Sequence, residues 1–252
     1  MNNTLKIYCK NINEYIAITG GETLQEIFLR ISDKINLAPI CAKVNNRTED
    51  LAFPVYSPKQ IEFIDSTSAS GNRVYTRSLC MILYKAVEDV AKGLHLRIEH
   101  SISKGHYCRL INPNNGIAEN VTDELVSEIK CRMNEIVNAD IPFVRKEKLT
   151  TDVIEIFKRQ NLNDKVQLLE TGHNLYTVYY QLDNLCDCYY GPLAPSTACI
   201  KAFDLQQYKE GFLLLGHSND NPKVAQSPIK QEKMFGAFTD YLSFNRILGI
   251  SN

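Results

Sequence analysis

Hydrophobic and polar residues alternate near the start of the chain in the manner of two short strands. Leu5, Ile7 and Cys9 are separated by polar residues, and Tyr15 and Ala17 repeat the pattern after a polar break. Successive side chains of a strand point to opposite faces, so this pattern predicts a hairpin with one buried face.

A helical pattern follows after Gly20-Gly21. Thr23 and Glu26 have the spacing of a capping box. The apolar residues behind them share one helical face: Leu24, Ile27, Phe28, Ile31 and Ile35. Pro39 is expected to stop this helix, and strands are predicted over 40–44 and 61–64. Two strands, a helix and further strands within residues 1–65 predict a ubiquitin-like β-grasp domain.

The remaining chain has the pattern of a second, α+β domain over residues 74–252, joined by a small, polar linker at 66–73. Apolar stripes predict helices over 79–90 and after Thr122, a third that starts with a capping box at Asp152 and Glu155, and a fourth over 232–247. Strands are predicted at 94–101, 106–111, 142–148, 166–169, 175–180 and 211–215. The predicted fold class is therefore α+β throughout.

Length, composition and net charge limit the classes of protein to which the chain can belong. With 252 residues, 44 % hydrophobic and 23 % charged, the chain has enough apolar material for two folded domains. It contains neither a run of about 20 apolar residues nor a signal-peptide pattern, so we expect a cytoplasmic protein with no membrane partner. The net charge is −1, so composition does not support nucleic-acid binding, which usually requires a basic excess.

Catalytic and metal motifs are absent from the sequence. No phosphate-binding G-x-x-x-x-G-K-[ST] loop occurs, and the five histidines never form H-x-x-x-H. The eight cysteines are scattered, which favours reduced, mostly buried thiols. Cys186 and Cys188 are the one close pair, and as metal ligands or a redox pair they have only weak support. We therefore predict no catalytic residue and no metal site.

Several motifs in order resemble known families. Residues 1–65 resemble a TGS domain, and residues 74–250 resemble the second additional domain of threonyl-tRNA synthetase, an editing domain related to alanyl-tRNA editing proteins. The second resemblance rests on five segments: Ser103-Lys-Gly-His-Tyr107, Asp164-Lys-Val-Gln-Leu-Leu-Glu170, Asp187-Cys-Tyr-Tyr-Gly-Pro192, Gly216-His-Ser-Asn219 and Met234-Phe-Gly-Ala-Phe238.

The editing residues of that family are not retained. The family's H-x-x-x-H on the first helix and C-x-x-x-H after the G-P turn correspond here to Arg77, Met81, Tyr189 and Leu193. Arg, Met and Leu do not replace imidazole as a metal ligand or a base that activates water. The resemblance thus predicts the fold of an editing domain without its hydrolytic chemistry.

A further resemblance suggests a parent protein. The pairing of these two modules, and the segment from Ile64 to Cys80, resemble the N-terminal half of bacterial uridine-kinase-like proteins. There a nucleoside kinase domain follows, which would bind ATP and Mg²⁺; this chain itself is predicted to hold no cofactor. The leading hypothesis is therefore a non-catalytic regulatory or ligand-binding module with a kinase domain C-terminal to it as partner. The alternatives are a trans-acting hydrolase of mischarged tRNA and an RNA- or ribosome-binding adaptor.

The resemblance also implies a candidate cleft between the first long helix and the Gly191-Pro192 turn. Its expected lining residues are Arg77, His106, Tyr107, Lys165, Asp187 and Tyr189. Arg77 and Lys165 would favour a nucleotide or another small anionic ligand. The structural alternatives are a salt bridge between Arg77 and Asp187, a surface position for Lys165 and a partly exposed turn position for His106.

Overall fold

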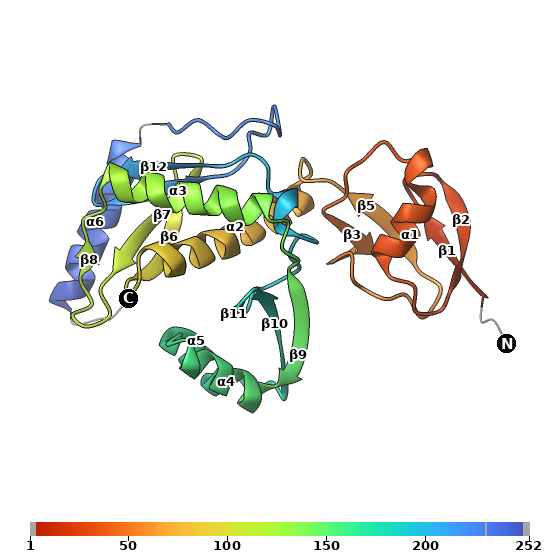
Figure 1. Cartoon of the computed structure of the whole chain (residues 1–252), viewed down its shortest axis with the longest axis horizontal. Helices are drawn as coiled ribbons and strands as arrows, with labels where there is room; N and C mark the ends of the chain where they lie inside the picture. Colours follow the sequence, from red (N-terminus) through yellow and green to blue (C-terminus); the bar gives the residue numbers. More distant parts are fainter. Residues whose placement is uncertain (1–3, 230, 249–252) are drawn as a thin grey trace. The chain divides into compact units, whose positions relative to one another are not determined.

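The computed structural model describes residues 4–229 and 231–248 and contains two compact units. The first unit combines the segment up to Lys85 with Met133–Lys201, and the second combines Ala86–Arg132 with the segment from Ala202 onward. Figure 1 shows the elements of each unit. The described fold is α+β with several sheets, as predicted. No helix in the described ranges has both the length and the apolar character of a membrane span.

The N-terminal part of the first unit is a five-stranded sheet with one helix. Its strand order is β2-β1-β5-β3-β4, in which β1 and β5 run parallel and the other pairs antiparallel. The elements are β1 Thr4–Cys9, β2 Glu14–Thr19, α1 Leu24–Ile31, β3 Cys41–Val44, β4 Arg47–Glu49 and β5 Gln60–Ile64. The predicted hairpin, helix and strands are confirmed, whereas β4 was not expected. Assignment to the TGS family stays a prediction.

The capping box and the apolar face predicted for helix α1 are both present. The Thr23–Glu26 capping box is formed, and Leu24, Ile27 and Ile31 are buried against the sheet. The helix ends at Ile31 rather than continuing to Ile35, because residues 32–34 tighten into a 3₁₀ turn.

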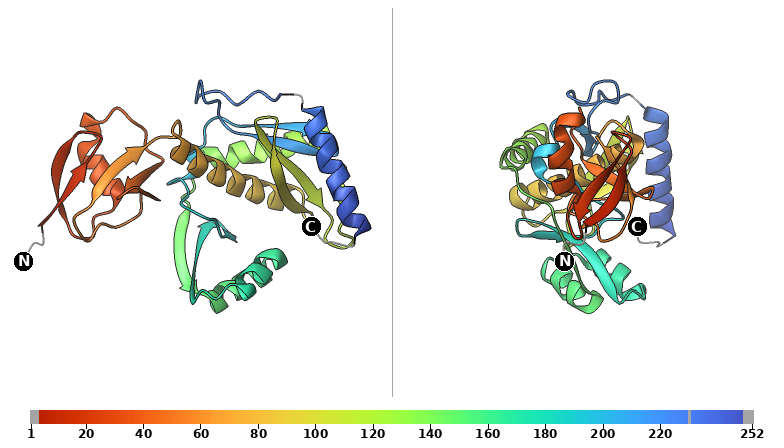
Figure 2. Two further views of the ribbon diagram at one scale, coloured as in Figure 1. Left: turned by 180° about the vertical axis from the view of Figure 1, so that it is seen from behind. Right: turned by 90° about the vertical axis from the view of Figure 1, so that its right-hand side faces the viewer.

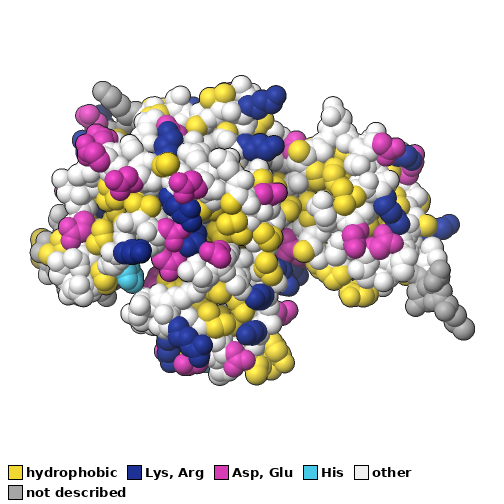
Figure 3. Space-filling model, in the orientation of Figure 1, with side chains coloured by type: hydrophobic (Ala, Val, Ile, Leu, Met, Phe, Trp, Pro, Cys, Tyr) yellow, Lys and Arg dark blue, Asp and Glu magenta, His cyan; other side chains and the backbone are white. Residues whose placement is uncertain are grey.

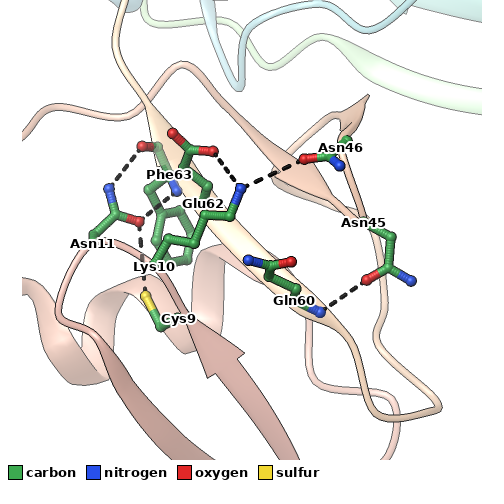
Figure 4. Close-up of polar contacts among 8 residues, drawn as sticks. All are labelled: Cys9, Lys10, Asn11, Asn45, Asn46, Gln60, Glu62 and Phe63. Atoms are coloured by element: carbon green, nitrogen blue, oxygen red, sulfur yellow. Dashed lines mark hydrogen bonds and ion pairs between the residues drawn. The ribbon is translucent and has the colours of Figure 1, made fainter.

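Side-chain amides tie the turns of this sheet to β5 (Figure 4). The Asn11 amide nitrogen donates to the Phe63 carbonyl at 2.9 Å, and the Phe63 N–H donates back to the Asn11 carboxamide oxygen at 2.7 Å. In the β3–β4 turn, Asn45 and Asn46 have positive φ, and Asn45 accepts a hydrogen bond from the Gln60 N–H at 2.9 Å. These contacts satisfy backbone groups of Gln60 and Phe63 in the central strand β5.

The C-terminal part of the first unit is a three-stranded antiparallel sheet, β11-β10-β9, with two helices. Val153, Phe157 and Tyr179 form the centre of its core. Its elements are β9 Val144–Leu149, α4 Thr150–Arg159, α5 Asn163–Thr171, β10 Tyr176–Leu182 and β11 Leu185–Asp187.

Two predictions for this part are wrong. The predicted strand over 166–169 is helix α5, where Val166 is the one residue buried at the core and Leu168 is exposed. A short apolar run does not distinguish a strand from one face of a helix. The predicted capping box is also not formed, because α4 begins at Thr150 without a side-chain cap and Asp152 lies inside its first turn.

The second unit is built on an antiparallel sheet with the order β12-β13-β7-β6, to which β8 adds beside β7. Helix α6 lies on one face of this sheet, as Figure 2 shows. Tyr107, Leu213 and Leu215 are buried under that helix. The elements are β6 His95–Ile102, β7 Gly105–Ile111, β8 Ala118–Glu119, β12 Asp204–Tyr208, β13 Gly211–Leu215 and α6 Glu232–Ile247.

Two long helices contribute residues to both units: α2 Ala69–Val90 and α3 Asp123–Asn138. Helix α2 starts at Ala69, so the last five residues of the predicted linker, 69–73, are helical. Gly71 allows a close approach of the backbone here, since a Cβ at this position would lie 1.7 Å from the Asp65 carbonyl oxygen.

Candidate functional site

Helix α2 and the Gly191-Pro192 turn are joined by Arg77. The Nε and Nη2 atoms of its guanidinium both donate to the Pro192 carbonyl, at 3.1 and 3.0 Å. Gly191 has φ +123°, and a Cβ there would lie 3.0 Å from Nη2 of Arg77. Only glycine combines this backbone conformation with so close an approach. The guanidinium therefore lies against the turn backbone and holds it in place.

The next residue of the helix, Ser78, holds the same segment through a second contact. The Ser78 hydroxyl donates to the Val74 carbonyl at 2.9 Å and accepts from the Ala194 N–H at 2.8 Å. Met81 and Leu193 are both fully buried. Two of the four positions at which the resemblance places editing residues thus belong to the hydrophobic interior.

Lys165 of α5 forms an ion pair with Asp187 at the end of β11. Asp187 is buried and also accepts the Cys188 N–H at 2.7 Å. The Lys165 ammonium lies 5.9 Å from the ring centre of Tyr84 and 5.5 Å from that of Tyr189. These are cation–π distances, so one carboxylate and two aromatic rings surround the ammonium.

Burial controls the protonation of the groups around this pair. Burial, and then the Asp187 carboxylate, raise the pKa of Tyr189 well above its usual value. Among the residues that the structure describes, the Tyr189 hydroxyl has no hydrogen-bond partner of normal geometry. The same two causes raise the pKa of Cys80 to about 12. Burial lowers the pKa of Arg77, although a guanidinium stays protonated in proteins. At neutral pH the site contains a neutral phenol and a neutral thiol beside the Lys165–Asp187 ion pair and the Arg77 guanidinium.

The two cations of the predicted cleft already have acceptors. Asp187 pairs with Lys165, so the salt bridge considered between Arg77 and Asp187 is not formed. Within the described ranges no carboxylate forms an ion pair with Arg77, which leaves the Pro192 carbonyl as its acceptor. Lys165 is largely covered rather than a surface lysine. Whether this cluster takes an anionic ligand stays a prediction.

His106 and Tyr107 belong to the second unit, on strand β7. His106 is therefore a strand residue, not the turn residue considered above; its Nδ1 lies 3.4 Å from the Ser101 hydroxyl, and burial lowers its pKa. Tyr107 is buried among Phe235, Phe238 and Tyr208, and burial raises its pKa to about 12. The structure thus gives Tyr107 a core role within its own unit.

Several partners of the site were not predicted. Cys80 and Tyr84 follow Arg77 on one face of α2 at helical spacing, a signal present in the sequence. The Tyr180 hydroxyl donates to Asp50 at 3.1 Å, and Arg145 lies 3.7 Å from the same carboxylate. That contact joins residues 130 positions apart, and nothing local predicts it.

Cysteine and histidine positions do not converge in the part of the chain that the structure describes. There, no three His, Cys, Asp or Glu side chains form a group that could hold a metal ion. Cys186 packs in the core with Val153 and Phe157, and burial raises its pKa. The Cys186 thiol is therefore a protonated hydrophobic group at neutral pH.

Comparison with known proteins finds similarity to threonine–tRNA ligases. The chain is 28 % identical over 204 residues to a threonine–tRNA ligase of Desulforamulus reducens, covering 80 % of this chain and 31 % of the ligase. It is 29 % identical over 195 residues to that of Pelodictyon phaeoclathratiforme, covering 76 % and 29 %. Against threonine–tRNA ligase 1 of Bacillus subtilis the identity is 27 % over 186 residues, covering 73 % and 28 %.

The chain thus spans about a third of the length of the curated relatives it matches. No protein-family model matches it. Its similarity to part of threonine–tRNA ligases agrees with the predicted editing-like domain. The comparison gives no support to a uridine kinase parent.

Proposed function

We propose that this chain is a tRNA-binding module that does not hydrolyse aminoacyl-tRNA. Of the three hypotheses drawn from the sequence, this is the RNA-binding adaptor. The observation that carries it is the arrangement at the Gly191-Pro192 turn, where Arg77 is bonded to a backbone carbonyl in a protein otherwise similar to threonine–tRNA ligases.

The RNA part of the proposal rests on the relatives. Their name states that they act on tRNA, and the similarity extends over about three quarters or more of this chain. The net charge of −1 sets a condition on binding, because phosphate contacts require local cations. On the face shown in Figure 3, Lys and Arg side chains are interspersed with Asp and Glu. We therefore expect few phosphate contacts and a weak salt dependence.

The non-hydrolytic part rests on residue chemistry. Hydrolysis of an ester needs a base or a metal-bound water beside the carbonyl carbon. At the four positions implied by the resemblance, Met81 and Leu193 are buried apolar side chains, and Arg77 donates to Pro192. Tyr189 is held neutral by burial beside Asp187. None of the four is a base at neutral pH, which favours binding without turnover.

Two measurements test the two parts separately. Fluorescence anisotropy with labelled tRNA, titrated with the full chain at increasing salt, should show saturable binding that exceeds binding to duplex DNA of equal charge. Equal affinity for both nucleic acids contradicts the RNA part.

The second measurement follows deacylation of mischarged tRNA in the presence and absence of added Zn²⁺. We expect the rate of the buffer control in both cases. A deacylation rate that rises in proportion to the concentration of the chain, and falls when a chelator is added, supports the trans-editing alternative instead.

The kinase-linked hypothesis stays a prediction of the sequence resemblance. It requires a nucleoside kinase domain as partner, with ATP and Mg²⁺ bound there, and a nucleotide or small anion on this chain. None of these features follows from similarity to threonine–tRNA ligases.

A further inference from the structure

Helix α6 presents an apolar stripe on its outer side. Its members recur at spacings of three and four residues, and all are exposed: Met234 (49 %), Ala237, Tyr241 (60 %), Phe244 (58 %) and Leu248 (54 %). Leu248 follows the last helical residue, but its N–H still donates to the Phe244 carbonyl at 3.0 Å. The stripe therefore continues along one face to the end of the described chain.

An adjacent face of α6 is already used. Phe235 and Phe238 pack against Tyr107 with ring centres 5.2 and 5.9 Å away, and Phe238 lies 4.1 Å from the ring of His100. Ring contacts of this kind stabilise packing beyond the area that they bury. Because the inner face holds the helix to the sheet, the outer stripe is presented on an anchored element rather than on a free tail.

We propose that this outer stripe is a self-association surface on which α6 of a second copy of the chain packs. Apolar residues at alternating spacings of three and four form the seam along which two helices pair. The partner must carry the same pattern, and a second copy supplies it. A soluble monomer rarely leaves so many large apolar side chains together on one helix.

Charge favours this occupant as well. The stripe has no ionisable group except the Tyr241 phenol, which is neutral at pH 7. The rest of α6 carries two acidic residues, Glu232 and Asp240, and two basic residues, Lys233 and Arg246. Two copies of a helix with balanced charge do not repel each other. A partner chosen by charge would instead need a single-sign surface.

The expected contact is small. A buried Tyr or Phe side chain contributes about 150–250 Å², and more than half of Tyr241 and Phe244 is available. With Met234 and Leu248 added, two copies bury at most on the order of 1,000 Å² in total, the lower end for a specific interface. We therefore expect a reversible dimer with a Kd in the micromolar range.

Sedimentation velocity of the full chain over a concentration series tests this inference. We expect monomer at low concentration and dimer at about 100 µM, two decades above a micromolar Kd. The variant Phe244→Asp should raise the Kd at least tenfold, because it places a charge in the seam. The matched control Ser243→Asp adds the same charge on another face of the helix and should leave the Kd within about threefold.

Circular dichroism should first show that both variants fold. If Phe244→Asp does not fold, Tyr241→Ala provides the same test through loss of apolar area alone. A chain that stays monomeric at about 100 µM overturns the inference, whatever other molecule α6 then binds. A dimer that Phe244→Asp and Tyr241→Ala leave unchanged overturns it too, since its interface lies elsewhere.

Discussion

Arg77 donates two hydrogen bonds to a single acceptor, the carbonyl oxygen of Pro192, 115 residues later in the chain. One carbonyl has two lone pairs, so both N–H groups are accommodated. A planar fork fits this acceptor, and no other cationic side chain has that shape. These two hydrogen bonds fix the Gly191-Pro192 turn relative to α2. The proposed loss of hydrolysis depends on this arrangement.

We expect Arg77→Lys to destabilise the first unit by about 1.5–3 kcal/mol, the range for hydrogen bonds to charged groups. Lysine keeps the charge but does not supply the two fixed donors. The free energy of unfolding from urea titration measures the effect. Arg73→Lys, one turn earlier and exposed, is the control and should change stability by less than about 0.5 kcal/mol. Equal effects of the two substitutions would contradict a specific role for Arg77.

Gly191→Ala should destabilise the chain more than Gly93→Ala. Both glycines have positive φ, +123° and +87°, so both substitutions carry backbone strain of about 1–2 kcal/mol. A Cβ at Gly93 meets nothing within 4 Å, whereas a Cβ at Gly191 meets the Arg77 guanidinium at 3.0 Å. Thermal unfolding of both variants, each also combined with Arg77→Ala, checks the contact. If removing Arg77 does not reduce the extra cost at Gly191, the steric explanation is wrong.

Lys165→Met should cost about 3–5 kcal/mol, because it leaves the Asp187 carboxylate buried without its counter-ion. The double variant Lys165→Met with Asp187→Leu should recover part of this loss, since an apolar pair replaces the ion pair. Lys158→Met is the control: Lys158 pairs with Glu155 and Glu170 on the surface, where ion pairs contribute about 0–1 kcal/mol. Urea unfolding of the wild type and the three variants measures these changes. A double variant less stable than Lys165→Met alone would rule out an unpaired carboxylate as the cause.

The second unit should lose stability as the solution becomes acidic. Burial lowers the pKa of His100; the neighbouring Glu99 acts in the opposite direction, and Arg109 acts with burial. Glu99 and Arg109 pair with each other. Within the described part of the chain, both ring nitrogens of His100 lack a hydrogen-bond partner. A lowered pKa means that the unfolded chain binds the proton more readily. The stabilisation is therefore complete above the unfolded pKa of about 6.5 and is lost as the pH falls through the folded value.

His100→Phe keeps an aromatic ring against Phe238 and removes the titrating group. We expect its unfolding free energy to fall less between pH 7.5 and pH 5 than that of the wild type. His106, whose pKa burial also lowers, accounts for part of the remaining change, so the double variant with His106→Gln should fall still less. An unchanged pH dependence in His100→Phe would show that His100 titrates alike in the folded and unfolded chain.

Local features of the sequence predicted most elements. The alternation over Leu5–Cys9, the Thr23–Glu26 capping box and the Asn45-Asn46 turn each involve residues that interact within a few positions, and all three are present in the structure. The same logic failed for 166–169, where only packing against Phe157 and Tyr179 distinguishes one face of a helix from a strand. A run of four residues is too short to show whether its apolar positions repeat with the period of a helix or of a strand.

The sequence by itself determined which side chains the protein has at the candidate site: Arg77, Met81, Tyr189 and Leu193, together with Lys165 and Asp187. Only the tertiary structure decided their partners. Lys165 forms an ion pair with Asp187, and Arg77 donates to the Pro192 carbonyl. His106 and Tyr107 belong to the other compact unit. The physical reason is that these partners are more than twenty residues apart, and an isolated segment carries no information about which distant acceptor satisfies a buried charge.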